Sequence, residues 1–155
     1  LSAKWGELAY QTEEYVPFNG EIKIKLSEHQ TNSNDTFIYF KTTNRKLYDY
    51  EFQRYNAEGY FDVIFANEEN NITEGAITNI FVVKNNKWLT PQLSDGLLNG
   101  IYRQHLMSQR RDIKETSIQL TDLLTAENIY LTNSVRGLVK VNKLVLADDG
   151  EIAFS

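Results

Sequence analysis

Cysteine is absent from this 155-residue sequence, which excludes disulfide bonds and thiolate metal sites and favours a cytoplasmic location. The two histidines, His29 and His105, cannot by themselves form a zinc site of the usual kind. No apolar run approaches the roughly 20 residues that a membrane-spanning helix needs. The net charge of −5 argues against a nucleic-acid-binding surface. These absences leave a globular domain without disulfides, a usual zinc site or a membrane-spanning helix.

What is present fits such a domain. Hydrophobic residues make up 41% of the chain and charged residues 24%, which is typical of a soluble globular protein. A chain of this length can bury a sizeable core. We see no internal repeat and no low-complexity segment, so the sequence predicts one folded domain.

Hydrophobic patterning predicts more strands than helices. In the first half, "EIKIKL" (21–26) alternates like a half-buried strand, the polar segment 27–36 is typical of a loop, and "FIYF" (37–40) resembles a short buried strand. Residues 46–58 permit a helix that Gly59 would end. Further strands are expected at 60–67, 79–84 and 87–91.

The second half continues in the same way. "IYRQHLMSQRR" (101–111) predicts a helix, and Thr121 is a candidate N-cap for a helix over 121–127. Residues 128–141 are strand-like around "TNSVRG", and the tail predicts a hairpin around "DDG". The expected fold class is α/β (α+β), strand-rich with flanking helices.

Lys41 is the first candidate for chemistry. It follows the apolar segment 37–40, and partial burial there would lower its pKa and make it a nucleophile or a base. A solvated lysine that leaves a strand is the more common explanation of such a residue taken alone.

Glu74 is the second candidate. It stands in "NNITEGAITNIF" between a threonine and a glycine, just before an apolar strand. A carboxylate held there by hydroxyls and backbone amides could hold a proton on a ring nitrogen. The alternative is an ordinary turn charge, the interpretation that we give to Glu68 and Glu69.

Two further segments could bind a phosphate group. In "NGIYRQ" a glycine leads into a helix, so the amides of Ile101 and Tyr102 should be free to bind an anion. In "TNSVRG" (132–137) the hydroxyl of Ser134 could add a contact. Each of the two segments also has a purely structural explanation.

The four motifs occur together and in order, as "FKTTNR", "NITEGAITNIF", "WLTPQLSDGLLNGIYRQ" and "YLTNSVRG". In this combination the chain resembles the class IV aminotransferase family, the pyridoxal-phosphate enzymes of fold type IV. The resemblance covers about residues 37–141. It implies the C-terminal large domain of the D-amino-acid-aminotransferase-like fold, with pyridoxal 5'-phosphate as the cofactor.

The resemblance also implies roles for single residues. Lys41 would form the Schiff base with the cofactor and move protons, and Glu74 would pair with the pyridine nitrogen. The amides of Ile101 and Tyr102 and the hydroxyl of Ser134 would hold the phosphate. Two further residues, Asn79 and Arg103, match conserved family positions and are expected to be structural or to support the residues that contact the cofactor.

Within the family the chain is most similar to the 4-amino-4-deoxychorismate lyases, which release 4-aminobenzoate and pyruvate in folate biosynthesis. The lysine is followed by Asn44 and Arg45, as in the lyases, whereas the transaminases usually bring a tyrosine toward the cofactor. Arg45 and Arg136 are the candidate substrate contacts. A branched-chain or D-amino-acid transaminase and a non-catalytic domain that retains the fold are the alternatives.

Family members have about a hundred residues ahead of the lysine, but here 40 residues precede Lys41. We therefore expect a partial N-terminal or linker segment at 1–36, a cofactor-binding domain at 37–155, and a longer parent chain. That parent could be the C-terminal part of a fused para-aminobenzoate synthase component I. The resemblance further implies a homodimer, served by a fused or separate aminodeoxychorismate synthase.

Overall fold

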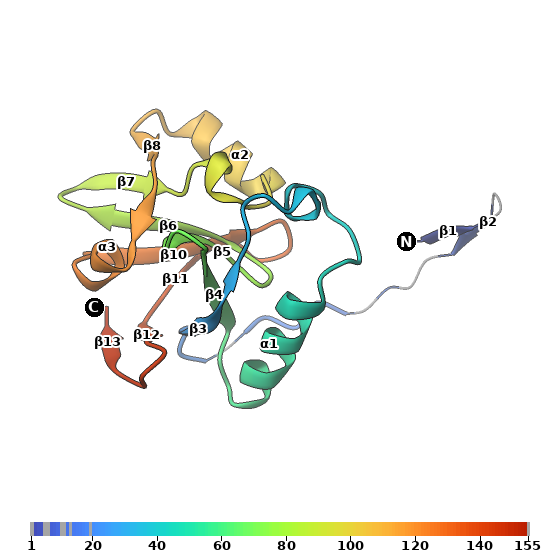
Figure 1. Ribbon diagram of the computed structural model, residues 1–155, viewed down its shortest axis with the longest axis horizontal. Helices are drawn as coiled ribbons and strands as arrows, with labels where there is room; N and C mark the ends of the chain where they lie inside the picture. Colours follow the sequence, from blue (N-terminus) through green and yellow to red (C-terminus); the bar gives the residue numbers. More distant parts are fainter. Residues whose placement is uncertain (1, 5–6, 10–11, 13, 19, 155) are drawn as a thin grey trace.

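The computed structural model of the protein describes residues 2–4, 7–9, 12, 14–18 and 20–154. Its centre is a large mixed sheet in which the strands follow the order β11-β10-β6-β5-β4-β3-β12-β13 (Figure 1). Two branches leave this path, because β7 pairs with both β6 and β8, and β9 pairs with β5. Neighbouring strands are antiparallel except in the pairs β3–β4, β3–β12 and β7–β8. A separate two-stranded sheet contains β1 and β2.

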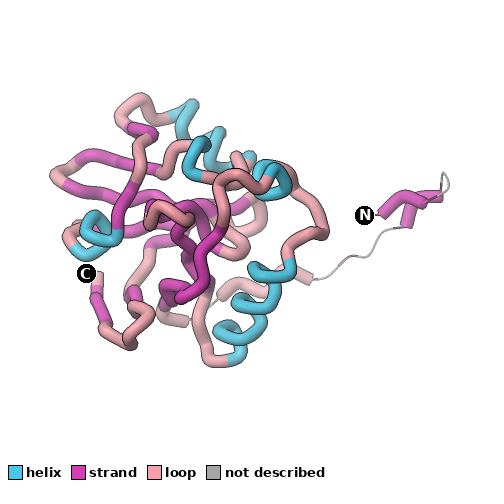
Figure 2. Tube along the Cα trace, in the orientation of Figure 1, coloured by secondary structure: helices cyan, strands magenta, loops and turns pink. Residues whose placement is uncertain are grey.

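Helices are few and lie at the outside of the sheet (Figure 2). This strand-rich α+β architecture confirms the predicted fold class. The strands are β1 Ser2–Lys4, β2 Glu7–Ala9, β3 Lys23–Thr31, β4 Asp62–Asn67, β5 Asn71–Gly75, β6 Asn79–Lys84, β7 Lys87–Thr90, β8 Ile113–Glu115, β9 Ile118–Gln119, β10 Asn128–Asn133, β11 Gly137–Lys140, β12 Lys143–Val145 and β13 Glu151–Ala153. The helices are η1 Thr36–Tyr39, α1 Lys46–Ala57, η2 Leu93–Asp95, α2 Ile101–Gln109 and α3 Leu120–Leu124, where η marks a 3-10 helix.

Strand β4 is buried on both faces. Alternate side chains of a strand point to opposite faces. Ile64 and Ala66 accordingly join the larger apolar cluster, and Val63 and Phe65 join a second one beneath α1. A strand packed on both sides needs a continuous apolar run, which "VIF" supplies. Burial of this kind makes β4 a rigid base for the loops at its ends.

Helix α1 packs against β4 through one face, where Tyr48, Glu51 and Tyr55 are buried. Their spacing of three and four residues places them on the same side of a helix. Glu58 caps its C-terminus, and Gly59 follows with a φ of 86°, a conformation that glycine adopts at little cost. The predicted helix and its end at Gly59 are confirmed.

Two predictions ahead of α1 are wrong. Strand β3 continues to Thr31 through the segment predicted as a loop, because after a register shift its last residues pair with the end of β4. Residues 37–40 form no strand: Asp35 caps the 3-10 helix η1 by accepting a hydrogen bond from the amide of Phe37. The strand predicted at 21–26 is confirmed as the first part of β3, although its half-buried alternation fails at Lys25, which is buried and binds Asp149 at 2.6 Å.

Most later elements correspond to their predictions. The expected strands at 60–67, 79–84 and 87–91 are β4, β6 and β7, "TNSVRG" joins β10 to β11, and the tail hairpin is β12–β13. Helix α2 begins as predicted and ends at Gln109, two residues early. Thr121 is not the cap of α3, because the N-cap is Gln119, two residues earlier, which forms a capping box with Asp122.

Two negative observations hold for the described part of the chain. None of its helices is both long and apolar enough to cross a membrane. No cluster of three or more His, Asp or Glu side chains among those residues could hold a metal ion.

Candidate active site

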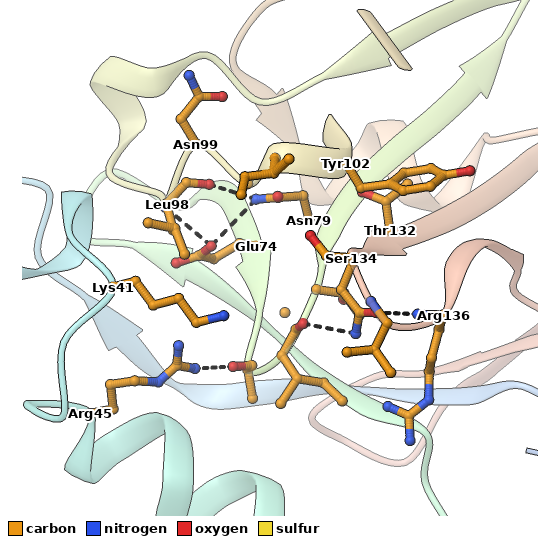
Figure 3. A pocket seen from close by; sticks show the side chains of 18 residues that line it. Lys41, Arg45, Glu74, Asn79, Leu98, Asn99, Tyr102, Thr132, Ser134 and Arg136 are labelled. Atoms are coloured by element: carbon orange, nitrogen blue, oxygen red, sulfur yellow. Dashed lines mark hydrogen bonds between the residues drawn. The ribbon is translucent and has the colours of Figure 1, made fainter. Parts of the chain in front are cut away.

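One cavity of about 450 Å³ gathers the residues that the sequence singled out. It lies between the loop that precedes α1, the β5–β6 turn, the start of α2 and the β10–β11 hairpin (Figure 3). Pockets of this size accommodate small molecules and cofactors. All seven predicted site residues line it: Lys41, Arg45, Glu74, Ile101, Tyr102, Ser134 and Arg136.

Lys41 lies in the loop between η1 and α1 and is exposed. Its side chain extends into the cavity, with Glu74 on one side and Arg45 on the other (Figure 3). The expected desolvation by the preceding aromatic residues is wrong, because Phe37 and Phe40 are 53% and 66% exposed. The amine is therefore directed at the cavity from a polar loop and not from the end of a buried strand.

Glu74 is the deepest charged group of the cavity and is 7% exposed. Its Oε2 accepts hydrogen bonds from the Leu98 amide at 3.2 Å and from Asn79 Nδ2 at 3.4 Å. The hydroxyl of Tyr48 donates to Oε1 at 3.3 Å. Burial nevertheless raises the pKa of Glu74 to about 8, since these donors only partly replace water. A cationic partner in the cavity would restore its charge.

This raised pKa has a testable consequence for stability. The pKa of Glu74 in the folded protein lies above the 4.5 of an ordinary glutamate, so its contribution to stability is largest below pH 4.5 and is lost as the pH rises through about 8. Relative to Glu74→Gln, the cofactor-free wild type should lose more than ~1 kcal/mol of unfolding free energy across that interval. Urea unfolding of both proteins at several pH values measures the difference, and parallel curves would contradict it. The comparison cancels the similar contribution of Asp62, whose pKa burial raises to about 6.

Gly75 follows Glu74 at a point where no side chain fits. A Cβ atom there would lie 2.2 Å from Asp62 Oδ2 and 2.5 Å from Thr78 Oγ1. Gly75→Ala should therefore lower the unfolding free energy by about 1–3 kcal/mol, the usual cost of overpacking. Gly150→Ala is the control, since its nearest contact would be 3.2 Å and it lies in the exposed tail. Equal denaturation midpoints for the two variants would refute the prediction.

The start of α2 faces the cavity with free backbone donors. Gly100 is the N-cap residue and offers no side chain to the first turn, which also lacks an acidic residue. Asn79 lies so close that a Cβ on Gly100 would be 2.2 Å from its Oδ1. The buried Arg103 anchors the segment by donating to Asn99 Oδ1, the Pro91 carbonyl and Glu115. The amides of Ile101 and Tyr102 can thus bind an anion.

The β10–β11 hairpin closes another side. Asn133 shapes its turn, because its Oδ1 accepts from the amides of Val135 and Arg136 at 3.1 and 2.7 Å. Ser134 stands at the tip, within the lining of the cavity. Thr132 also lines the cavity, is 1% exposed, and has a buried hydroxyl that bonds to no described residue.

Thr132 is a site residue that sequence reasoning did not single out. The sequence carried no clear signal for it, because Ser134 lies in the turn after β10 and "TNS" is therefore not a pair of hydroxyls on one strand face.

Two arginines add positive charge to the cavity. The guanidinium of Arg45 donates a hydrogen bond to the Ala76 carbonyl and lies 5.1 Å from the centre of the Tyr48 ring. Arg136 lies 5.2 Å from the centre of the Phe61 ring, and its buried Nε has no hydrogen-bond partner in the described structure. The two cations suit an anionic ligand.

Known proteins share both this sequence pattern and this fold. Residues 6–144 match the family model of class IV amino-transferases. Among curated proteins, an aminodeoxychorismate lyase of Bacillus subtilis is 34% identical over 85 residues, which cover 52% of this chain and 29% of that protein. A mitochondrial branched-chain-amino-acid aminotransferase of Arabidopsis thaliana is 31% identical over 98 residues, which cover 59% of this chain and 26% of that protein. Lyases and transaminases therefore match about equally well.

A solved structure from Legionella pneumophila, titled "Putative 4-amino-4-deoxychorismate lyase", superposes with a TM-score of 0.84 at 26% identity. The superposed region covers 94% of this chain and 54% of the Legionella chain. This chain therefore spans less than two thirds of the length of each of these three relatives. The expected cofactor class is confirmed for the family, whose enzymes depend on pyridoxal phosphate. The chain belongs to the class IV aminotransferases.

Proposed function

We propose that this chain is the cofactor-binding part of a pyridoxal-phosphate-dependent lyase that converts 4-amino-4-deoxychorismate to 4-aminobenzoate and pyruvate. The observation that carries the proposal is the placement of Lys41 and Glu74 in one cavity, an amine opposite a buried carboxylate. An amine can hold an aldehyde covalently, and a carboxylate can hold a proton on a ring nitrogen.

The residues present fit the cofactor at both ends. Free amides at the start of α2 and the unpartnered hydroxyl of Thr132 suit a phosphate group, and Ser134 adds another hydroxyl. At Glu74, a pKa raised by burial leaves a carboxyl that a protonated ring nitrogen would stabilise in its charged form.

Residues of this chain have separate roles in the proposed reaction. Lys41 would hold the cofactor through Nζ, and its amine, once free, would remove the proton from the substrate carbon that bears the amino group. When bound, pyridoxal phosphate supplies a ring that withdraws the resulting negative charge. Glu74 keeps the proton on the ring nitrogen, and the Leu98 amide and Asn79 hold the Glu74 carboxylate in place.

The rest of the reaction needs little from the protein. The bond between the carbocycle and the enolpyruvyl oxygen breaks, Lys41 returns its proton to the departing group, and pyruvate leaves. The carbocycle becomes aromatic, which drives the step. Arg45 and Arg136, which line the cavity, are proposed to bind the two carboxylates of the substrate.

A branched-chain or D-amino-acid transaminase is the second candidate, since such an enzyme from Arabidopsis is also similar in sequence. The lyase is favoured by Arg45, which follows Lys41 by four residues and projects into the cavity beside it (Figure 3).

Substrate assays separate the candidates. The protein is expressed from the complete reading frame of its gene, loaded with pyridoxal phosphate, and given aminodeoxychorismate or, separately, a branched-chain or D-amino acid with 2-oxoglutarate. The lyase predicts 4-aminobenzoate and pyruvate from the first mixture and no glutamate from the second. Glutamate alone would establish the transaminase, and no product from either mixture would favour a non-catalytic domain.

Three further features belong to the same proposal. The active protein is a homodimer, a fused or separate aminodeoxychorismate synthase supplies its substrate, and the reaction takes place in the cytoplasm. The cofactor-binding domain is proposed to comprise 37–155. Because β3 precedes residue 37 and pairs with both β4 and β12, the boundary is tested by comparing the folding of 37–155 with that of a longer version that retains β3.

A further inference from the structure

Asp62 is a buried carboxylate that the proposed reaction does not use. It begins β4, directly beneath the turn at 75–78, and is 1% exposed. Its oxygens accept hydrogen bonds from the Thr78 hydroxyl at 2.6 Å, the Val63 amide at 2.8 Å and the Ile77 amide at 3.3 Å. No described residue forms an ion pair with it. Burying an unpaired carboxylate is costly, so its presence calls for a reason.

The turn above Asp62 connects the separate parts of the site. Glu74 immediately precedes it on β5. On its outer side, the Ala76 carbonyl accepts a hydrogen bond from Arg45, in the segment that carries Lys41. The Ile77 carbonyl accepts one from Asn133 Nδ2 at 3.2 Å, in the hairpin that carries Ser134. The position of this turn therefore affects three walls of the cavity at once.

Backbone hydrogen bonds also fix the turn at 75–78. The Gly75 amide donates to the Thr78 carbonyl at 2.7 Å, and the Ala76 amide donates to the Val63 carbonyl at 2.8 Å. Even one methyl group at Gly75 would collide with Asp62 and Thr78. The hydrogen bond between Asp62 and Thr78 thus fixes a turn whose four residues, 75–78, line the cavity, whereas Asp62 itself does not.

We propose that Asp62 and Thr78 are positioning residues, whose hydrogen bond holds the turn at 75–78 so that Lys41, Glu74 and Ser134 keep their places around the cofactor. The inference rests on the proposed function, since it concerns the same cavity. Asp62 does not line the cavity, and the two residues act through the Ala76 and Ile77 carbonyls and through the strand that carries Glu74.

The test compares Thr78→Val, which has the same shape without the hydroxyl, with Thr78→Ser, which keeps the hydroxyl. Both are made in protein from the complete reading frame, and pyridoxal phosphate is titrated into each. Thr78→Val should bind the cofactor about tenfold more weakly, the effect of losing a hydrogen bond to a charged group, and Thr78→Ser should restore most of the affinity. The visible circular dichroism of the bound cofactor should change in Thr78→Val and not in Thr78→Ser. Asp62→Asn should shift both readouts in the same direction as Thr78→Val.

Thr90→Val is the matched control. Thr90 is fully buried and donates its hydroxyl to the Ile80 carbonyl at 2.9 Å, but it does not line the cavity. It should lose stability without a change in cofactor affinity or dichroism. Equal weakening in Thr78→Val and Thr90→Val, or wild-type affinity in Thr78→Val, would overturn the positioning role.

Hydrogen exchange separates this inference from the proposed function. In cofactor-free protein, Thr78→Val should speed exchange of the Ala76 and Ile77 amides and of the hairpin around Ser134, whereas Thr90→Val should not. Unchanged exchange there would refute the role of Thr78. Absence of cofactor binding in the wild type, together with this altered exchange, would instead refute the proposed function alone.

Discussion

Replacing Lys41 with alanine is expected to abolish covalent attachment of pyridoxal phosphate and to remove the visible absorbance band that accompanies it. Lys41 is the lysine that lines the cavity opposite Glu74. Because the same amine is proposed to move the proton, turnover should fall by roughly 10²–10⁴-fold or more, the usual contribution of a general base. Absorbance spectra and 4-aminobenzoate release, measured on protein from the complete reading frame, give the two readouts.

Lys46→Ala is the matched control for this variant. Lys46 begins α1 five residues later, is exposed, and does not line the cavity. Its replacement should leave both the band and the turnover unchanged. Persistence of the band in Lys41→Ala would remove Lys41 from its proposed role, whatever the turnover.

Glu74→Gln should leave the fold intact and reduce turnover by about 10²–10³-fold. Glutamine preserves the shape and can still accept from the Leu98 amide, which bonds to Glu74 Oε2 at 3.2 Å. It cannot keep a ring nitrogen protonated by charge, and preorganised groups that stabilise developing charge contribute about that much to rate. Turnover and far-ultraviolet circular dichroism of the same sample measure the two effects separately.

Glu69→Gln is the control, because Glu69 lies in the turn before β5 and is exposed. It should have wild-type turnover. Wild-type turnover in Glu74→Gln as well would mean that Glu74 is only a structural residue. The proposed protonation of the ring nitrogen would then lose its proposed partner in this chain.

Much of the fold followed from local patterns. The central strand β4 was recognisable because its apolar run is continuous, and α1 because Gly59 ends it at a positive φ. The failures arose where tertiary contacts override local preference. Strand β3 extends through a polar segment because β4 offers it backbone partners, and "FIYF" forms a 3-10 helix because Asp35 caps it.

In the candidate site, too, local sequence motifs identified some residues, and tertiary contacts were needed to identify the others. Lys41, Glu74 and Ser134 were identified by residue type and motif order, and the cavity contains all three. Asp62 and Thr132 were missed, because their importance lies in contacts between strands distant in sequence. Asp62 bonds to Thr78 sixteen residues later, and the unpartnered hydroxyl of Thr132 becomes notable only once its burial is known. Motifs identify the groups that do chemistry, whereas the residues that position them require the structure.

Reductive trapping tests the central claim most directly. Borohydride treatment of the protein loaded with pyridoxal phosphate, followed by proteolysis and mass spectrometry, locates the lysine that carries the cofactor. We predict a single pyridoxyl-modified peptide that contains Lys41. Modification of a different lysine, or none in protein from the complete reading frame, would contradict the assignment of this cavity as the cofactor site.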